Sequence, residues 1–510
     1  MAVGKLWPSR AADAEAPIFL EWRSSSAFII FVVVFAVFTD ILLYGLIVPV
    51  TPTALHERVG LSQGEEQRWT SILLALYGAA LLAFSPIAGY IADKIQSRWW
   101  PLMVGLIALG AATALLCVGT HMGLWVAGRL FQGASAAVVW TVGCALLVDT
   151  VSKDELGQAM GYIGMGMTLG IMGGPLLGGV IYEHGGYYAV FGLAFGLVGL
   201  DIVFRLIMIE KKHAARWLPP DSAKQKEKKK SQDSETTQDS VKSDGQHSPD
   251  TLQPPPPSSS GHSSNTQSVP KPDATPDQSS ATRPRKGALG ALQHLLASER
   301  MLASLWAYFI TSVILTCFDS VLPLYVEETF GWEQTGQGLI FIPLSVPHIL
   351  DPLVGYVIDT YGNSRRYLAG VALIASVPIL VLLRFVTYNS MGQKVLLCAL
   401  LVLTGVCLAV LLPSVMVEAS YVVSDKEEET PEIFGKGGAM ALSYGLLNSA
   451  FAAGTIVGPF FAGFIRESAG WGTMAWAMAI LTGVSSVPTL LCLGGFQLKR
   501  KKGSGSHPSP

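Results

Sequence analysis

Four ionisable side chains lie inside long apolar stretches, where an unpaired charge is energetically costly. They are Asp40, Asp319, Asp351 and His348, and His348 precedes Asp351 by three residues, which places the two on one face of a helix. An aspartate at the centre of a membrane span costs about 2.5 to 3.5 kcal/mol on insertion scales. A carboxyl between apolar walls that binds a proton on one side and releases it on the other supplies the chemistry of a proton-coupled carrier. The alternative for each is a hydrogen-bonded structural group.

Two arginines in apolar sequence receive different interpretations. Arg129, in "GRLFQG", carries a guanidinium that cannot neutralise itself by losing its proton, so we expect it to work with the acids. Arg205 follows Asp201 by four residues near the predicted end of a span, a spacing that allows a local ion pair. We interpret this second pair as structural.

Other chemistry finds no support in the sequence. It has no cluster with metal-ligand spacing, no phosphate-binding loop and no pairing of nucleophile and base, so we predict no metal, no cofactor, no nucleic-acid partner and no enzymatic reaction. The six cysteines all fall inside apolar stretches, where we expect them to pack.

The elements that position these residues are membrane spans. Of the 510 residues, 50% are hydrophobic and 14% are charged, which indicates a polytopic membrane protein. A window of roughly 20 apolar residues predicts twelve helices and no strand. The predicted spans are 27–50, 70–92, 99–120, 123–148, 158–182, 187–209, 303–326, 337–359, 366–386, 393–417, 438–465 and 473–497.

Lysine and arginine set the predicted orientation. They gather in the tails and in the connections that hold Lys94, Arg98, Arg365 and Arg366, and are sparse on the opposite side. The positive-inside rule then places both termini in the cytosol. The Pro- and Ser-rich sequence between spans six and seven cannot bury enough apolar surface to order itself, which predicts a linker. The predicted divisions are a cytosolic tail at 1–26, a six-helix bundle at 27–209, a disordered cytosolic linker at 210–300, a second six-helix bundle at 301–497 and a cytosolic tail at 498–510.

Glycine and proline repeat between the two halves. Each position of the set in the fifth span returns 284 residues later in the eleventh span, with alanine in place of glycine at Ala462 and glycine again at Gly463, which indicates a duplication and a pseudo-symmetric pair of bundles. Small residues four apart let helices touch in lipid, so we expect spans five and eleven to form a close, bendable contact that shapes a cavity. The residues are Gly161, Gly170, Gly174, Pro175, Gly178 and Gly179 in the first half, and Gly445, Gly454, Gly458 and Pro459 in the second.

A second motif also repeats, with an offset of 266. Gly89 and Asp93 in "SPIAGYIADKIQSR" return as Gly355 and Asp359 in "DPLVGYVIDTYGNSRR". Asp149 and Glu418 end spans four and ten on the same predicted side, where Arg98 and Arg365 begin neighbouring connections. We predict that these eight residues form a gate held by ion pairs.

These motifs resemble the major facilitator superfamily, within it the drug:proton antiporter group, and most of all its vesicular amine transporter branch. The resemblance rests on the glycine and proline motif of span five, on "GRLFQG" in span four, and on "TDILLYGLIVPVTP" and "FDSVLPLYVEETFGWEQTGQGLIFIP" in spans one and seven. It implies the two-bundle fold of that superfamily, a monomer in the lipid bilayer, and exchange of a small molecule for protons. Two positions depart from the family's cytosolic motif, Gln96 and Ser97. Amine transporters carry a lysine in span two and acids in spans ten and eleven, where this chain has Tyr77, Leu408 and Asn448, which weighs against a biogenic amine.

We therefore expect a secondary active transporter, a proton-coupled antiporter that exports a small lipophilic or cationic organic molecule by alternating access. A proton-independent facilitator and a non-transporting sensor on the same fold stay open as alternatives. The expected membrane is the plasma membrane, with a vacuolar or vesicular membrane as the alternative. The predicted cavity is aromatic with few fixed charges, which suits such a substrate better than a sugar. Its candidate residues are Tyr44, Tyr77, Trp140, Tyr444 and Asn448.

Overall fold

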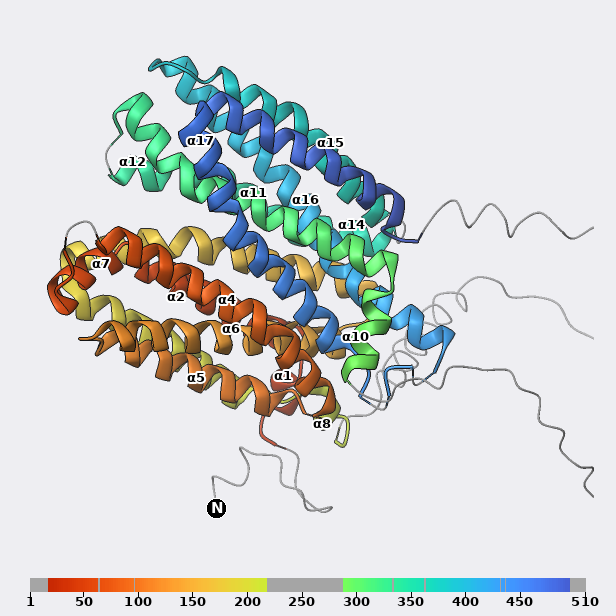
Figure 1. The fold of residues 1–510 in the computed structure, drawn as a ribbon. Coiled ribbons are helices and arrows are strands. Elements are labelled where there is room, and N and C mark those ends of the chain that lie inside the picture. The colour runs from red at the N-terminus through yellow and green to blue at the C-terminus, as the bar shows by residue number, and fades with distance from the viewer. Residues whose placement is uncertain are drawn as a thin grey trace, which may run out of the picture. The chain divides into compact units, whose positions relative to one another are not determined.

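The computed structural model describes residues 17–217 and 288–495, apart from residues 63–64, 96, 333, 362–363, 432 and 436. Within these residues the regular structure is entirely helical, and the long helices form two bundles (Figure 1). The first bundle contains α1 (Leu20–Arg23), α2 (Ser26–Ile47), α3 (Thr51–Ala54), a π-helical turn (Leu55–Val59), α4 (Glu65–Lys94), α5 (Trp99–Cys117), α6 (Met122–Thr150), a 3₁₀ turn (Lys153–Glu155), α7 (Leu156–Ile207) and α8 (Lys211–Ala214). The second contains α10 (Ala288–Leu296), α11 (Glu299–Phe330), α12 (Gln334–Leu339), α13 (Phe341–Ser345), a 3₁₀ turn (Val346–Leu350), α14 (Asp351–Thr360), α15 (Ser364–Leu382), a 3₁₀ turn (Leu383–Phe385), α16 (Met391–Glu429) and α17 (Met440–Cys492).

Two of the helices are double spans. Among the described residues ten helical segments are long and apolar enough to cross a membrane, and two of them, α7 and α17, hold 52 and 53 residues. Each is broken once by a glycine in a left-handed conformation, Gly186 with φ 72° and Gly470 with φ 83°. A side chain with a Cβ rarely adopts that conformation, so these glycines allow the reversal between spans five and six and between spans eleven and twelve. The predicted twelve-helix fold is confirmed.

The predicted eighth span is not one continuous helix. Residues 334–360 form α12, α13, a 3₁₀ turn and α14 in succession. Pro343, Pro347 and Pro352 each lack a backbone N–H, and a proline inside a helix removes a hydrogen bond and clashes with the preceding turn. His348 and Asp351 lie at this interruption, in the middle of the 3₁₀ turn and at the first residue of α14.

Most of the motif glycines pack within their own bundle, and not between spans five and eleven as a pair, whereas Gly161 meets α14 and Gly445 meets α4 of the other bundle. A Cβ on Gly174 would meet the backbone of Gly45 in α2, and a Cβ on Gly178 would meet that of Leu46. In the second bundle, Gly454 and Gly458 are packed in the same way against α11. The expected close contact therefore exists twice, span five on span one and span eleven on span seven.

Ordered helices extend into both ends of the predicted linker. Residues 211–214 form α8 and residues 288–296 form α10, although the prediction assigned 210–300 to disorder. Leu295 on α10 is fully buried, and the Lys426 ammonium of α16 donates to the His294 carbonyl at 2.7 Å. The rest of the predicted linker, residues 218–287, lies outside the described residues.

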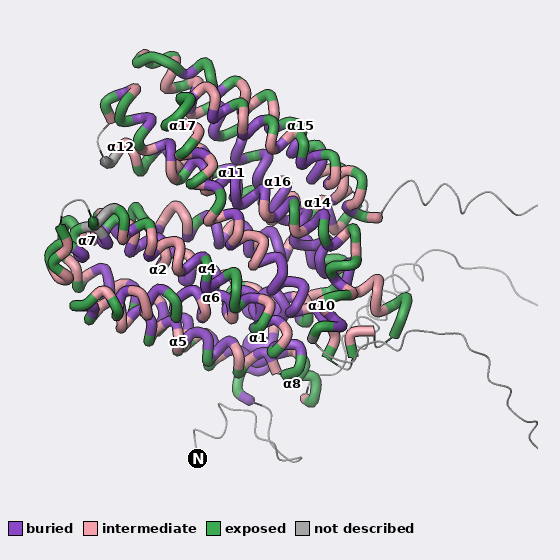
Figure 2. The backbone as a smooth tube through the Cα atoms, viewed as in Figure 1, coloured by how far each residue is buried: buried purple, intermediate pink, exposed green. Residues whose placement is uncertain are grey.

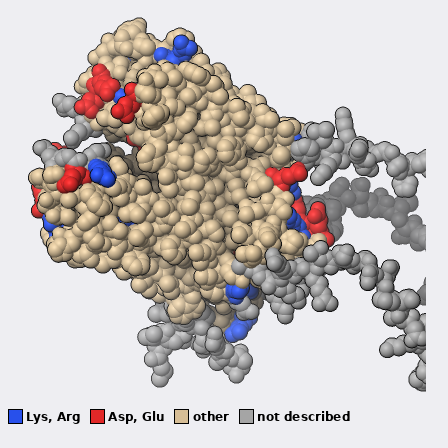
Figure 3. All heavy atoms as spheres, viewed as in Figure 1, with Lys and Arg blue, Asp and Glu red and all other residues tan. Residues whose placement is uncertain are grey.

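The exterior is that of a lipid-embedded protein. Buried residues gather where the helices face one another, and exposed residues follow the outer faces (Figure 2). Many of the exposed residues are large and apolar, such as Phe131, Val371 and Phe460. In Figure 3 the charged side chains appear near the two ends, with an uncharged surface between them. A contiguous apolar exterior of this kind is favourable in hydrocarbon and costly in water.

Candidate functional site

At one end of the molecule each bundle caps a helix of the other. The two carboxylate oxygens of Asp93, at the end of α4, accept from the backbone N–H groups of Ala441 and Leu442, both at 2.8 Å. The Asp359 carboxylate, near the end of α14, accepts from Gly157 at 2.6 Å and Gln158 at 2.8 Å. The first N–H groups of a helix lack partners within the helix, and the helix dipole favours a negative charge there. We call this the gate end.

Backbones meet closely at the gate end. A Cβ on Gly89 would collide with the Ala441 carbonyl, and a Cβ on Gly355 would collide with the Gly157 carbonyl. Gly161 lies in the same way against the backbone of Asp351. No side chain could stand at these positions without moving one bundle away from the other, so the gate end is closed.

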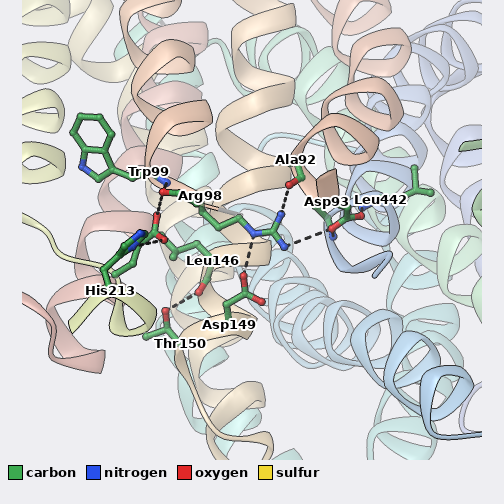
Figure 4. A network of polar contacts seen from close by, with 12 residues as sticks. Ala92, Asp93, Arg98, Trp99, Leu146, Asp149, Thr150, His213 and Leu442 are labelled. Atoms are coloured by element: carbon green, nitrogen blue, oxygen red, sulfur yellow. Dashed lines mark hydrogen bonds and ion pairs between the residues drawn. The ribbon is translucent and has the colours of Figure 1, made fainter. Parts of the chain in front are cut away.

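Arg98 joins two acids of the first bundle (Figure 4). Its guanidinium lies 3.5 Å from Asp93, is hydrogen bonded to Asp149 at 3.0 Å and donates to the Ala92 carbonyl at 2.6 Å. The arginine therefore ties the gate acid Asp93 to the end of α6. The predicted ion pair forms within one bundle, whereas the contact between bundles is the carboxylate on backbone N–H groups.

In the second bundle the arginine has different partners. Glu418 is fully buried and accepts from Arg365 at 2.5 Å, from Arg300 at 2.7 Å and from the backbone N–H of Gly494 at 2.9 Å. Arg300 also pairs with Asp425 at 2.6 Å. The sequence interpretation assigned Glu418 and Arg365 to the gate and missed Arg300, whose position one residue into α11 was the available signal.

Four of the predicted residues come together in the first bundle. The Tyr77 hydroxyl donates to Asp40 at 3.4 Å, and the rings of Tyr77 and Tyr44 lie 4.6 Å apart. The Arg129 guanidinium carbon lies 5.7 Å from the centre of the Tyr44 ring. Arg129 is fully buried and donates to the Gln132 side chain at 2.9 Å, while its Nε and one terminal nitrogen have no hydrogen-bond partner among the described residues. A buried cation with free donors and a buried acid are therefore joined through two tyrosine rings.

Asp319, the repeat counterpart of Asp40, is exposed although it stands well inside α11. Tyr44 of the other bundle lies within electrostatic range of it, so Asp319 faces the space between the bundles and not lipid. Figure 3 shows a hollow between the bundles at the end where α12 lies, away from the gate end. We call this the hollow end.

His348 and Asp351 pair with each other, as their spacing predicted. The His348 Nδ1 atom lies 3.1 Å and 3.2 Å from the two carboxylate oxygens, and both side chains are buried. A Cβ on Gly164 would contact the Asp351 carboxylate, which places the pair where α14 meets α7 of the other bundle. The pair therefore belongs to the closed contact between the bundles.

The remaining cavity candidates are buried. Trp140 is 7% exposed and packs in the apolar core. Asn448 donates to Ser85 of the other bundle at 2.8 Å, and the Tyr444 hydroxyl donates to the Met416 carbonyl at 3.3 Å. Tyr444 and Asn448 line the closed contact and not the open hollow. Gly179 has open space where a Cβ would stand, so the fifth-span motif is not all packing.

The comparison with known families decides the identity. The Major Facilitator Superfamily model matches residues 33–424 and, in a second match, residues 345–509. This chain belongs to the major facilitator superfamily.

Relatives of this superfamily include named transporters. The MFS-type transporter ppzB of Metarhizium rileyi is 31% identical over 94% of this chain and 98% of its own length. The class B tetracycline resistance protein of Escherichia coli is 31% identical over 27% of this chain and 34% of its own length. The vesicular acetylcholine transporter of Drosophila melanogaster is 27% identical over 36% of this chain and 35% of its own length. The predicted resemblance is confirmed, and the chain is a transporter of this superfamily with drug-efflux relatives.

A solved structure supports the fold independently. The human organic anion transporter MFSD10 superposes with a TM-score of 0.59 over 91% of this chain and 99% of its own, at 17% sequence identity. At that identity the likeness extends to the major facilitator fold alone. The two helical bundles therefore belong to one known fold.

Proposed function

We propose that this chain is a proton-coupled antiporter that exports a small lipophilic or cationic organic molecule by alternating access. The observation that carries the proposal is the placement of two repeat-related acids. Asp319 lies exposed at the hollow between the bundles, and Asp40 lies buried on the Tyr77 hydroxyl, whose ring faces Tyr44 and, beyond it, the Arg129 guanidinium. A carrier that exchanges protons for substrate needs one acid that binds the proton and a cavity that reaches it from one side at a time.

The substrate class follows from the walls of that space. The rings of Tyr44 and Tyr77 lie 4.6 Å apart at a tilt of 36° next to Asp40, and Asp319 supplies a negative charge that a cation would satisfy. An aromatic wall with an acid attracts a cation or an apolar ring. The tetracycline resistance relative supports export of an organic molecule.

The gate end faces the cytosol in this proposal, because the Lys- and Arg-rich connections at residues 94–98 and 365–366 lie there. The closed gate end and the hollow at the other end then correspond to a state open to the outside. We propose the plasma membrane as its location and a monomer as the working unit.

Transport by purified protein in liposomes with an imposed pH gradient tests the proposal. The probes are ethidium, a lipophilic cation, and tetracycline. We expect the wild type to concentrate at least one probe against its gradient, and Asp40→Asn to abolish that uphill movement while downhill exchange stays measurable. Asp319→Asn should weaken the same step less severely.

Three outcomes separate the alternatives. Equilibration of probe without response to the pH gradient would make the chain a facilitator. An Asp40→Asn protein that still concentrates the probe would pass the proton role to Asp319 or to the pair of His348 and Asp351. Binding without any flux would favour a sensor on the same fold.

A further inference from the structure

A buried carboxyl outside the proposed cavity has no partner. Asp201, in the second half of α7, is fully buried, and neither of its carboxylate oxygens has a hydrogen-bond partner among the described residues. The expected ion pair with Arg205 does not form. Arg205 points past Asp201 toward Glu210, 3.8 Å away, and toward the sulfur of Met208 at 3.3 Å. An unpartnered buried carboxylate is costly, so a charge at Asp201 needs another explanation.

The helix register places Asp201 against the first span. The rings of Phe35 in α2 and Phe204 in α7 meet edge to face at 5.4 Å between centroids. The two segments run in opposite directions, so one turn further along α2 is opposite one turn back along α7. Those positions are Thr39 and Asp201. The Thr39 hydroxyl interacts with the Asp201 carboxyl, but their geometry falls short of a hydrogen bond, so the buried hydroxyl has no hydrogen-bond partner among the described residues.

Asp40 follows Thr39 in the chain and lies within electrostatic range of Asp201. One Asp40 oxygen takes the Tyr77 hydroxyl at 3.4 Å, and the other has no hydrogen-bond partner among the described residues. Asp40 and Asp201 therefore each have a carboxylate oxygen without a hydrogen-bond partner, and the Thr39 hydroxyl, also without one, lies between them in an apolar interior.

The groups that face Asp201 come from three directions. Its own helix contributes Arg205, whose charge is shared with Glu210 further along the chain. From α2 come Thr39 and Asp40. From α5, the Trp99 indole donates to the backbone carbonyl of Arg205, one turn beyond Asp201, at 2.9 Å.

We propose that Asp40 and Asp201 form a coupled carboxyl pair that shares one exchangeable proton, with Thr39 as the hydroxyl between them. Two nearby carboxylates in an apolar interior do not both ionise. In the exchange, the proton leaves an Asp40 oxygen for the Thr39 oxygen as the Thr39 proton moves to Asp201. The negative charge passes from Asp201 to Asp40, and the hydroxyl is regenerated. The proton-binding site is therefore a pair that reaches away from the hollow into the first bundle.

A titration cycle tests the pair without any substrate. The full-length protein is reconstituted in phosphatidylcholine vesicles, and the infrared absorbance of protonated carboxyl groups is followed against pH. We compare the wild type with Asp40→Asn, Asp201→Asn and the double variant. Subtraction of the double-variant curve leaves the absorbance of the Asp40 and Asp201 carboxyl groups. We expect the wild-type difference curve to have two steps whose positions differ by at least one pH unit from the single steps of the two variants.

The outcomes are distinct. If the two single-variant curves add up to the wild-type curve, the carboxyls are independent and the pair does not exist. The same cycle with Asp201 and Asp359, which lies at the gate end on the other bundle, should be additive and serves as the control. If Asp201→Asn fails to fold, Asp201→Glu keeps a carboxyl and should retain two steps.

The hydroxyl is tested by isotope exchange. Thr39→Val removes it at nearly equal volume and should slow hydrogen-to-deuterium exchange of the pair at least fivefold, whereas Thr39→Ser should exchange as the wild type does. Equal rates in all three proteins would remove Thr39 from the proposal. This inference deepens the proposed proton coupling, yet the titration stands if transport proves uncoupled, because it measures the proton alone.

Discussion

The two halves of this transporter carry the same gate acid and hold it in different ways. Asp93 is 7% exposed, caps the start of α17 and is tied by Arg98 to Asp149. Asp359 is half-buried and caps the start of α7, but the arginine that follows it, Arg365, turns away to Glu418.

The difference separates what the duplication kept from what it changed. The contact between bundles is in both halves a carboxylate on two backbone N–H groups, so helix capping is the shared part of the gate. The arginine differs. In the first half Arg98 contacts the gate acid Asp93. In the second half Arg365 binds the buried Glu418 inside its own bundle, and Arg300 binds the same carboxylate. The first gate should therefore depend on charge more than the second.

Removal of Glu418 should have the largest effect on stability. Glu418→Ala leaves Arg300 and Arg365 without their buried partner, and breaking a buried ion pair in this way costs about 3 to 5 kcal/mol. Thermal unfolding of the purified protein in detergent measures it. Asp149→Ala is the matched control, because the Asp149 side chain is 49% exposed and such pairs contribute about 0 to 1 kcal/mol. Equal losses in both variants would contradict the contrast between the halves.

A methyl group at the second gate should push the bundles apart. In Gly355→Ala the new Cβ meets the Gly157 carbonyl of the other bundle, and overpacking of this kind costs about 1 to 3 kcal/mol. Met160 of α7 is fully buried, and its sulfur lies 3.8 Å from the Tyr444 hydroxyl of the other bundle. We expect the gate end to open, seen as faster labelling of Met160→Cys by a membrane-impermeant maleimide, in a background without the native cysteines. Gly179→Ala is the control, because its Cβ meets open space and alanine favours a helix. Labelling that stays slow in Gly355→Ala would mean that the contact relaxes locally.

Neutralisation of the first gate acid should also open the gate end. Asp93→Asn keeps the size of the side chain but loses the charge that Arg98 and two backbone N–H groups share, and one amide position becomes a donor facing donors. We expect the closed state to lose about 1 to 2 kcal/mol, roughly a 5- to 30-fold change in its equilibrium. The same maleimide reaction at Met160→Cys reports it. If accessibility is unchanged, Asp93 contributes to orientation in the membrane and not to the gate.

The fold followed from the sequence, and the repeats pointed to residues that meet at the contact between the bundles. Hydropathy and the repeated glycines define the two bundles, and the repeats of Asp93 and Asp359 predicted a gate in each half. Hydropathy could not locate the break in the eighth span, since three prolines there are compatible with an apolar run. The hydropathy pattern also could not show with which acid each arginine forms an ion pair.

Long-range partners explain the other differences. Tyr444 and Asn448 have the residue types of a cavity wall, but in the structure Asn448 bonds to Ser85 and Tyr444 contacts Met160, both of the other bundle. Asp201 and Arg205 have the spacing of an ion pair, yet the competing acid Glu210 lies five residues beyond Arg205 and takes its charge. A spacing rule counts neighbours on one helix and cannot weigh such a competitor.

The second gate acid gives the smallest effect and the sharpest test of the comparison. Asp359→Asn removes a charge from two backbone N–H groups, as Asp93→Asn does, but no arginine loses its partner and the half-buried site is screened by water. The expected loss is below about 1 kcal/mol, and maleimide labelling at Met160→Cys should rise less than fivefold. The double variant Asp93→Asn/Asp359→Asn should equal the sum of the two singles, because the two caps share no side chain and act at separate helix ends. An Asp359→Asn effect as large as that of Asp93→Asn would show that Arg98 adds nothing, and that the two gates work by helix capping alone.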